Sequence, residues 1–233
     1  MQPVPVKKTI SIIFILLLSL SLKNSFAAPS YGTRLPEKNK IDIGLQNYTI
    51  LKRYQENNLG SLKSGENFLL LSYGVFDWFS IDLKGGAGNI KQHPQGSAEI
   101  DYATNFAGGY GFRLKFFDKD NMKAVFGFQH ISVHPYSKIS AGVKNKAILD
   151  DWQVSLLGSY SFKICTPYLG TRWSRVDYIH WTDGSRKRVM SDPDKSIGLI
   201  TGIDIPVTKK IWFNAEGQFF DSSAFSLSLN YSF

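Results

Sequence analysis

The chain has 233 residues, a formal net charge of +8 and a single cysteine, Cys165. This length suits one domain, and a lone cysteine excludes an internal disulfide. The mild positive charge is compatible with an anionic lipid surface and does not by itself require nucleic acid. We expect no nucleic-acid partner, because the first residues indicate export.

The amino-terminal segment predicts a cleaved secretory signal. Residues 10–22 contain only Ile, Leu, Phe and Ser and follow two lysines. A spanning helix needs about 20 apolar residues, whereas a signal core needs about 7–15. Ser25 and Ala27 are small residues at the −3 and −1 positions of a cleavage site. We therefore assign 1–27 to a signal peptide and 28–233 to the mature domain, with an uncleaved anchor helix as the alternative.

Strict alternation between residues 100 and 116 is the strongest structural signal. The even positions read Ile, Tyr, Thr, Phe, Gly, Tyr, Phe, Leu and Phe, whereas the odd positions are small or polar. Successive side chains of a β-strand point to opposite faces, so this pattern predicts a strand with one apolar face. The segment exceeds the roughly 9–11 residues that a tilted strand needs to cross a membrane.

The same alternation returns in nine further segments, although Phe68 and Leu70 blur it in the second one. No apolar run of 18 residues follows the signal, so a spanning helix is excluded, and a bilayer then leaves only a closed barrel. We predict an all-β, closed antiparallel up-and-down transmembrane barrel of about ten strands, with eight or twelve still open. The further segments are 41–45, 69–75, 79–83, 122–128, 151–163, 169–173, 197–205, 211–219 and 225–233.

The connections between these segments alternate in length. Those near residues 77, 118–121, 166–167 and 208–209 are tight, whereas 52–65, 87–98, 135–147 and 182–193 are longer. Short periplasmic turns and longer external loops are typical of outer-membrane barrels. Aromatic residues cluster near the strand ends, as in an interfacial girdle. A periplasmic β-sandwich or lipocalin-like binding protein is the alternative fold.

The last segment resembles the carboxy-terminal strand of bacterial outer-membrane proteins, and the mature chain resembles the superfamily of small outer-membrane β-barrels. This resemblance implies the bacterial outer membrane as the location and a terminal strand read by the barrel-assembly machinery. It also implies periplasmic chaperones, outer-membrane lipids and lipopolysaccharide as partners. The residues expected to form the assembly signal are Phe225, Leu227, Leu229, Tyr231 and Phe233.

Charged residues on the polar face of the strands predict a lumen network. Six acids and six bases can pair across a narrow lumen, which offsets part of their desolvation cost. Barrels of about eight strands are filled by side chains, so we expect a mostly plugged barrel with at most a thin water-filled path. Solvated positions at the rims are the alternative. The twelve residues are Asp42, Asp82, Asp101, Asp151, Asp204, Glu216, Lys84, Arg113, Lys115, Lys123, Lys163 and Arg172.

A second set of cations lies around the 182–193 connection. Guanidinium groups suit bidentate contact with phosphate, so these residues are candidates for contact with lipopolysaccharide, and an ordinary hydrophilic loop is the alternative. The set comprises Arg172, Arg175, Arg186, Lys187 and Arg188.

An enzymatic reading rests on His130 and Ser132, which are similar to the His-x-Ser pair of lipid A deacylases. A serine nucleophile needs a neighbouring histidine and an acid that orients it. The glutamate expected from that family is absent after the pair, and only Asp150 and Asp151 are candidates. We find no metal-ligand cluster or phosphate-binding glycine loop in the sequence and expect no cofactor. The sequence therefore favours a non-enzymatic barrel with a structural, surface-interaction or narrow-pore role.

Overall fold

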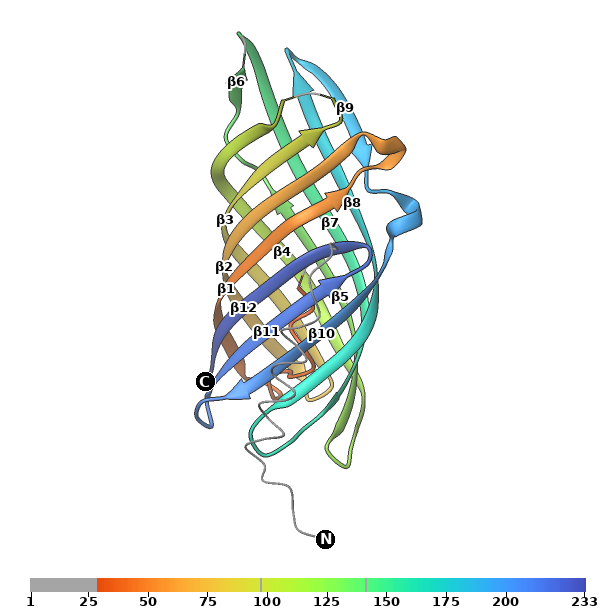
Figure 1. Cartoon of the computed structure of the whole chain (residues 1–233). Helices are drawn as coiled ribbons and strands as arrows, with labels where there is room; N and C mark the ends of the chain where they lie inside the picture. The colour runs from red at the N-terminus through yellow and green to blue at the C-terminus, as the bar shows by residue number, and fades with distance from the viewer. Residues whose placement is uncertain (1–28, 97, 141) are drawn as a thin grey trace, which may run out of the picture.

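The computed structural model describes residues 29–96, 98–140 and 142–233, so the expected signal peptide lies outside the described residues. Ten long strands form a closed antiparallel barrel (Figure 1), which confirms the predicted fold and excludes the sandwich. The ten strands are β1 (Ile41–Tyr54), β2 (Gly60–Phe76), β3 (Phe79–Pro94), β4 (Ile100–Lys119), β5 (Met122–Val133), β7 (Val143–Tyr160), β8 (Thr166–Thr182), β10 (Ile197–Pro206), β11 (Ile211–Phe219) and β12 (Ser222–Ser232).

Each long strand pairs with its neighbour in the chain, and the pairing of β1 with β12 closes the ring. Two short strands, β6 (Lys138–Ser140) and β9 (Ser185–Met190), pair with β7 and β8 and lengthen two hairpins. No helix among the described residues is long and apolar enough to cross a bilayer.

The barrel has two different ends. At one end, which we call the turn end, tight connections join β2 to β3, β4 to β5, β7 to β8 and β10 to β11. At the other, the hairpin end, several strands rise well beyond the rest of the wall (Figure 1). Much of the sequence expected to form long loops there is strand instead, including residues 60–65, 87–94 and 143–147. These residues satisfy their backbone groups by extending the hairpin ladders.

Alternation along the strands separates an inner and an outer face. The inner face is polar over much of its length, whereas large apolar side chains are exposed on the outside, as a barrel in lipid requires. The resulting apolar belt includes Leu45, Leu69, Leu83, Leu156, Leu169, Trp173, Ile197 and Leu229.

Near the hairpin end, β-bulges reverse this alternation in β1 and β4. In β4, the register with β3 shifts between Gly88 and Ile90, so that Tyr102 is buried inside the barrel. In β1, the register shifts after Ile50, so that Arg53 points inward. A bulge adds one residue to a strand and therefore exchanges the two faces beyond it. Alternation extended from the middle of these two strands therefore assigns residues near the hairpin end to the wrong face.

The wall narrows toward the hairpin end because the β11–β12 hairpin is short. The chain turns at Phe220 and Asp221. Toward the hairpin end, the pairing of β12 with β1 therefore stops at Ser222, where β12 begins. Beyond this turn, Gln55 forms a bridge with Ser191 across the gap. The two strands of this hairpin thus drop out of the wall, leaving a bore close to that of about eight strands, which side chains can fill.

Candidate functional site

A buried ion pair links the strands that surround the turn-end half of the lumen. Arg113 of β4 donates from Nε and Nη2 to the two carboxylate oxygens of Asp82 on β3, each at 2.8 Å. Ser72 and Gln129 donate to the same carboxylate, at 2.6 and 3.2 Å. Bidentate, charge-assisted contact of this kind is among the stronger polar interactions in proteins. It joins strands β2 to β5 from the inside.

A second buried cluster lies where the wall narrows. Asp221, in the β11–β12 turn, accepts from Arg172 of β8 at 2.9 and 3.0 Å and from Arg53 of β1 at 3.1 Å. Ser174 donates to the same carboxylate at 2.5 Å. All of these side chains are almost fully buried. The short hairpin is therefore anchored to strands on both sides of it through one carboxylate.

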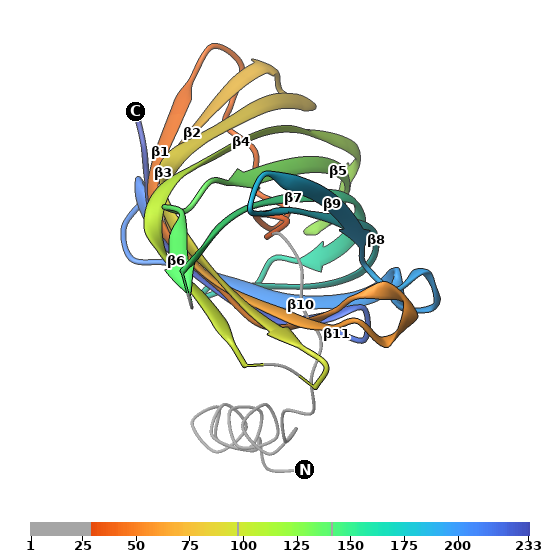
Figure 2. The ribbon, with the colours of Figure 1, turned by 90° about the horizontal axis from the view of Figure 1, so that it is seen from above.

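The first described residues enter the lumen from the turn end, and Figure 2 shows them, in red, inside the ring of strands. We call residues 29–36 the strap. The backbone N–H of Ser30 donates to Glu216 at 2.9 Å, and Gln153 donates to the Ser30 hydroxyl at 2.8 Å. Ser30 and Thr33 are almost completely buried. The strap therefore occupies space that would otherwise be an aqueous path.

Further contacts fix the strap in one conformation. Arg113 donates to the carbonyl oxygens of Tyr31 and Arg34 at 3.2 and 2.5 Å, and the Arg34 guanidinium lies 3.9 Å from the ring centroid of Trp212. Gly32 has a φ of +65°, and a Cβ there would lie 3.0 Å from Asp204. Only glycine adopts this backbone conformation freely, which explains a glycine at this position.

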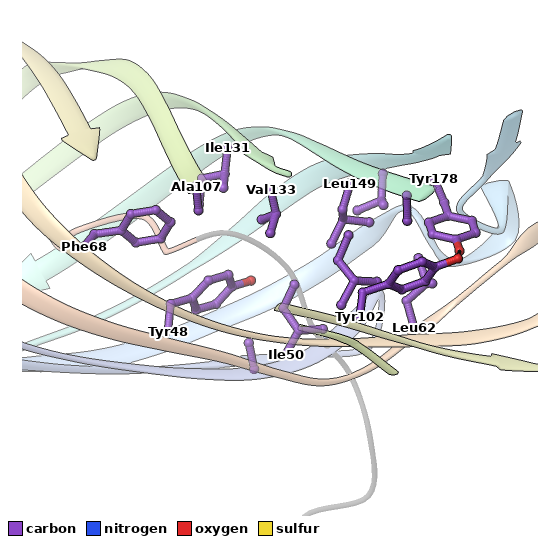
Figure 3. Packing of buried hydrophobic residues seen from close by; sticks show 14 of the residues in the cluster. Tyr48, Ile50, Leu62, Phe68, Tyr102, Ala107, Ile131, Val133, Leu149 and Tyr178 are labelled. Carbon is purple, nitrogen blue, oxygen red and sulfur yellow. Dashed lines mark hydrogen bonds between the residues drawn. The ribbon is translucent and has the colours of Figure 1, made fainter. Parts of the chain in front are cut away.

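The hairpin-end half of the lumen is mainly apolar, although Glu66 and Gln92 are also buried there. Figure 3 shows aliphatic and aromatic side chains from opposite walls meeting inside the barrel. The hydroxyl of Tyr178 donates to Gln92 at 2.7 Å, so the polar tip of this buried side chain has a hydrogen-bond partner. We call this set the apolar plug. It includes Ile50, Leu62, Phe68, Ile90, Tyr102, Ile131, Val133, Leu149, Val176 and Tyr178.

Most of the charged residues expected in the lumen lie there. Lys115 and Lys123 are half-buried and line a cavity of about 370 Å³ at the turn end, together with Arg34 and Asp204. The ammonium of Lys84 lies 4.3 Å from the ring centroid of Tyr31 in the strap. The residues that are buried inside the barrel are Asp42, Asp82, Lys84, Arg113, Asp151, Arg172, Asp204 and Glu216.

Two of the expected lumen residues lie elsewhere. Asp101 is on the outside because the bulge in β4 exchanges its position with that of Tyr102, and it binds Lys91 at 2.6 Å. This hydrogen bond, beyond the apolar belt, raises the pKa of the Lys91 ammonium above its ordinary value. Lys163 is exposed in the connection between β7 and β8, because β7 ends at Tyr160.

Sequence reasoning missed several buried polar residues. Arg53 and Glu66 lie in or beside a segment expected to be a loop, and Asp221 lies in the short connection before the last strand, where alternation makes no prediction. The strap was not anticipated because Ser30 and Thr33 carry no periodic signal. Phe68 and Leu70, which disturbed the alternation of β2, were a real sign of the apolar interior.

The His130–Ser132 pair is on the outer face and is not arranged as expected. His130 stacks on Trp152 at a centroid distance of 3.9 Å, and its Nδ1 lies 3.2 Å from the carbonyl oxygen of Asp151. The hydroxyl of Ser132 instead lies 2.8 Å from Nε2 of His134 and donates to Asp150 at 2.5 Å. Asp150 thus contacts the serine and not a histidine, whereas a catalytic acid would orient the histidine.

The cations expected to form one external cluster are divided by the wall. Arg172 is buried in the lumen, whereas Arg175 and Arg188 bind Asp177 on the outer face. Arg186 lies beside Trp181, also on the outer face.

The carboxy-terminal row lies on the outer side of β12, next to β1 and β11. All five members are exposed: Phe225, Leu227, Leu229, Tyr231 and Phe233. Their role as an assembly signal stays a prediction.

Comparison with solved structures finds similarly shaped barrels at low sequence identity. The transport unit of the autotransporter AIDA-I from Escherichia coli is 13% identical with a TM-score of 0.48, covering all of both chains. Ail, the attachment invasion locus protein of Yersinia pestis, is 9% identical with a TM-score of 0.45, covering 83% of this chain and 97% of that one. The outer membrane protease OmpT from E. coli is 12% identical with a TM-score of 0.44, covering 86% and 99%.

No protein-family model matches the sequence, and no curated protein matches it. None of the structural similarities assigns an activity to this chain.

Proposed function

We propose that this chain is a closed, non-conducting barrel of the bacterial outer membrane that acts through its outer surface, as a structural or surface-interaction protein. A bilayer accepts strands only as a closed ring with an apolar exterior. The ring of ten strands and the exposed apolar belt meet both requirements. By the usual asymmetry of such barrels, the turn end faces the periplasm and the hairpin end faces outward.

A closed, non-conducting state is supported by two separate obstructions in the lumen, the strap and the apolar plug. The strap lies across the turn-end half, where hydrogen bonds with Glu216, Gln153 and Arg113 hold it, and it leaves a recess of about 370 Å³ at the mouth. The apolar plug fills the hairpin-end half, where Leu149, Tyr102 and Tyr178 are almost fully buried. Protein interiors packed in this way leave few voids larger than a water molecule.

Ion conductance of the refolded protein in planar bilayers tests this proposal. The mature chain is expected to show no channel steps, and a variant lacking residues 29–36 is expected to remain silent because the apolar plug persists. Removing the strap and also changing Tyr102 and Tyr178 to Ala is expected to open a small pore. Steady conductance by the unaltered mature chain would contradict the proposal.

Hydrolysis of outer-leaflet lipid esters is the second candidate, favoured by the 2.8 Å contact between Ser132 and His134. Here His134, rather than His130, would accept the serine proton. The contact of Asp150 with Ser132 instead of His134 speaks against a preformed triad. Release of fatty acid from lipid A, abolished in both Ser132→Ala and His134→Ala, would establish this activity. Equal release by these variants and the parent would exclude it.

A further inference from the structure

Cations are concentrated on one side of the outer surface, just beyond the apolar belt. On β7 and β8, Ala147, Leu149 and Tyr178 point inward and are buried, and on β9 Val189 packs against the same cluster. Their neighbours along each strand therefore point outward. These outward neighbours include five cations and two carboxylates, Asp150 and Asp177. We call this surface the cationic face. Its cations are Lys144, Lys146, Arg175, Arg186 and Arg188.

Apolar and aromatic side chains are interleaved with these cations. The Lys146 ammonium and the Arg186 guanidinium lie 5.1 and 5.8 Å from the ring of Trp181. Ile148 and Ile179 form the next row toward the belt. Below them Asp177 binds Arg175 and Arg188, whose side chains remain 42% and 49% exposed. Both guanidinium groups are thus oriented by a carboxylate and keep donors available to an outside acceptor.

The opposite wall, on β1 to β3, has a different chemistry at its outer surface. There Asn47 donates to Asn67 at 3.0 Å, and Asn89 accepts from the backbone of Gly65 at 2.7 Å. Lys91, farther out, is bound by Asp101. Lys52 and Lys63 are two further outward cations on this wall, and Glu99 and Asp101 are its counter-charges beside Lys91. The surplus of positive charge is therefore smaller on this wall than on the cationic face.

We propose that the cationic face binds a phosphorylated glycolipid of the outer leaflet, with the lipid phosphates on Arg175, Arg186, Arg188 and Lys146. Acyl chains of such a lipid would lie on the belt next to Trp152, which pairs with Arg175 across β7 and β8. The rows of isoleucine and Trp181 suit the apolar edge of a sugar headgroup, and the surplus of three cations suits its phosphates. This partner rests on the proposed surface role.

The test uses the full mature chain in phosphatidylcholine nanodiscs, titrated with bis-phosphorylated lipid A, its dephosphorylated form or phosphatidylglycerol. Arg186→Glu/Arg188→Glu is compared with Lys163→Glu/Lys209→Glu, an equal charge change in two periplasmic turns. We expect the first pair to weaken binding of phosphorylated lipid A at least about tenfold and the control pair to leave it unchanged. Lys144→Glu/Lys146→Glu, which breaks no ion pair of the face, is expected to act in the same direction.

Three outcomes would overturn the inference. One is equal binding of phosphatidylglycerol, another is equal binding of dephosphorylated lipid A, and the third is an equal loss in the periplasmic control. Heat-modifiable gel mobility verifies that each variant is folded. Because lipid binding and conductance are measured separately, a conducting barrel would contradict the proposed function without deciding this inference.

Discussion

The two halves of the lumen are filled by opposite means. In the turn-end half, ion pairs and the strap occupy a bore that ten strands leave too wide for side chains alone. In the hairpin-end half, two strands have dropped out, and side chains such as Leu149 and Tyr102 meet directly. Bore width therefore accounts for the different chemistry of the two halves of this interior. A wide section needs polar partners, whereas a narrow one can be packed like a protein core.

The largest expected effect comes from Asp221→Asn, at the boundary between the two halves. Arg53 and Arg172 lose their shared carboxylate, and breaking a buried ion pair costs about 3–5 kcal/mol. The free energy of unfolding, measured by urea titration in vesicles, should fall by about that amount. Asp120→Asn in an exposed turn serves as the control and should change little. Equal free energies of unfolding for the two variants would contradict the proposed anchoring of the hairpin by Asp221.

Within the apolar half, Leu149→Ala should lower the free energy of unfolding by about 3 kcal/mol, because it leaves a cavity in a closely packed interior. The same titration measures it. Leu83→Ala, on the outer face of the barrel, leaves no internal cavity, and we expect a smaller loss. A larger loss at Leu83 would show that the interior is not packed as described.

Within the polar half, Gly32→Ala should loosen the strap. An alanine at positive φ costs about 1–2 kcal/mol, and its Cβ would press against Asp204 and Tyr168. Protease cleavage within residues 29–36 of the folded barrel should become faster, while the heat-modifiable mobility of the barrel is unchanged. Gly184→Ala, at positive φ in an external turn with open space around it, is the control for backbone strain alone. Unchanged protection of the strap would show that it is not held by this conformation.

The smallest effect is expected outside the lumen. Asp101→Asn removes an ion pair with Lys91 that is exposed to solvent, and such pairs contribute little. The urea midpoint should not move measurably, in contrast to Asp82→Asn inside the polar half. A clear loss in Asp101→Asn would mean that the residue faces the interior after all.

The sequence predicted the ten strands and most of the inward residues because a period of two is a direct consequence of strand geometry. Asp82, Arg113 and Glu216 follow from it. What it did not reveal depends on contacts between distant segments. The bulge that turns Asp101 outward is visible only in the pairing with β3, and the burial of Asp221 depends on Arg53 and Arg172. The strap has no pattern of its own, since its position is set by the walls around it.

The early end of the β11–β12 hairpin gives the barrel the form of a cup. A bore that tapers to a packed floor receives molecules only at its wide mouth and offers them no exit at the other side. The recess lined by Lys115 and Lys123 therefore exchanges its contents with the turn-end compartment alone. In the proposed orientation that compartment is the periplasm, so a small molecule held in the recess would come from it and return to it.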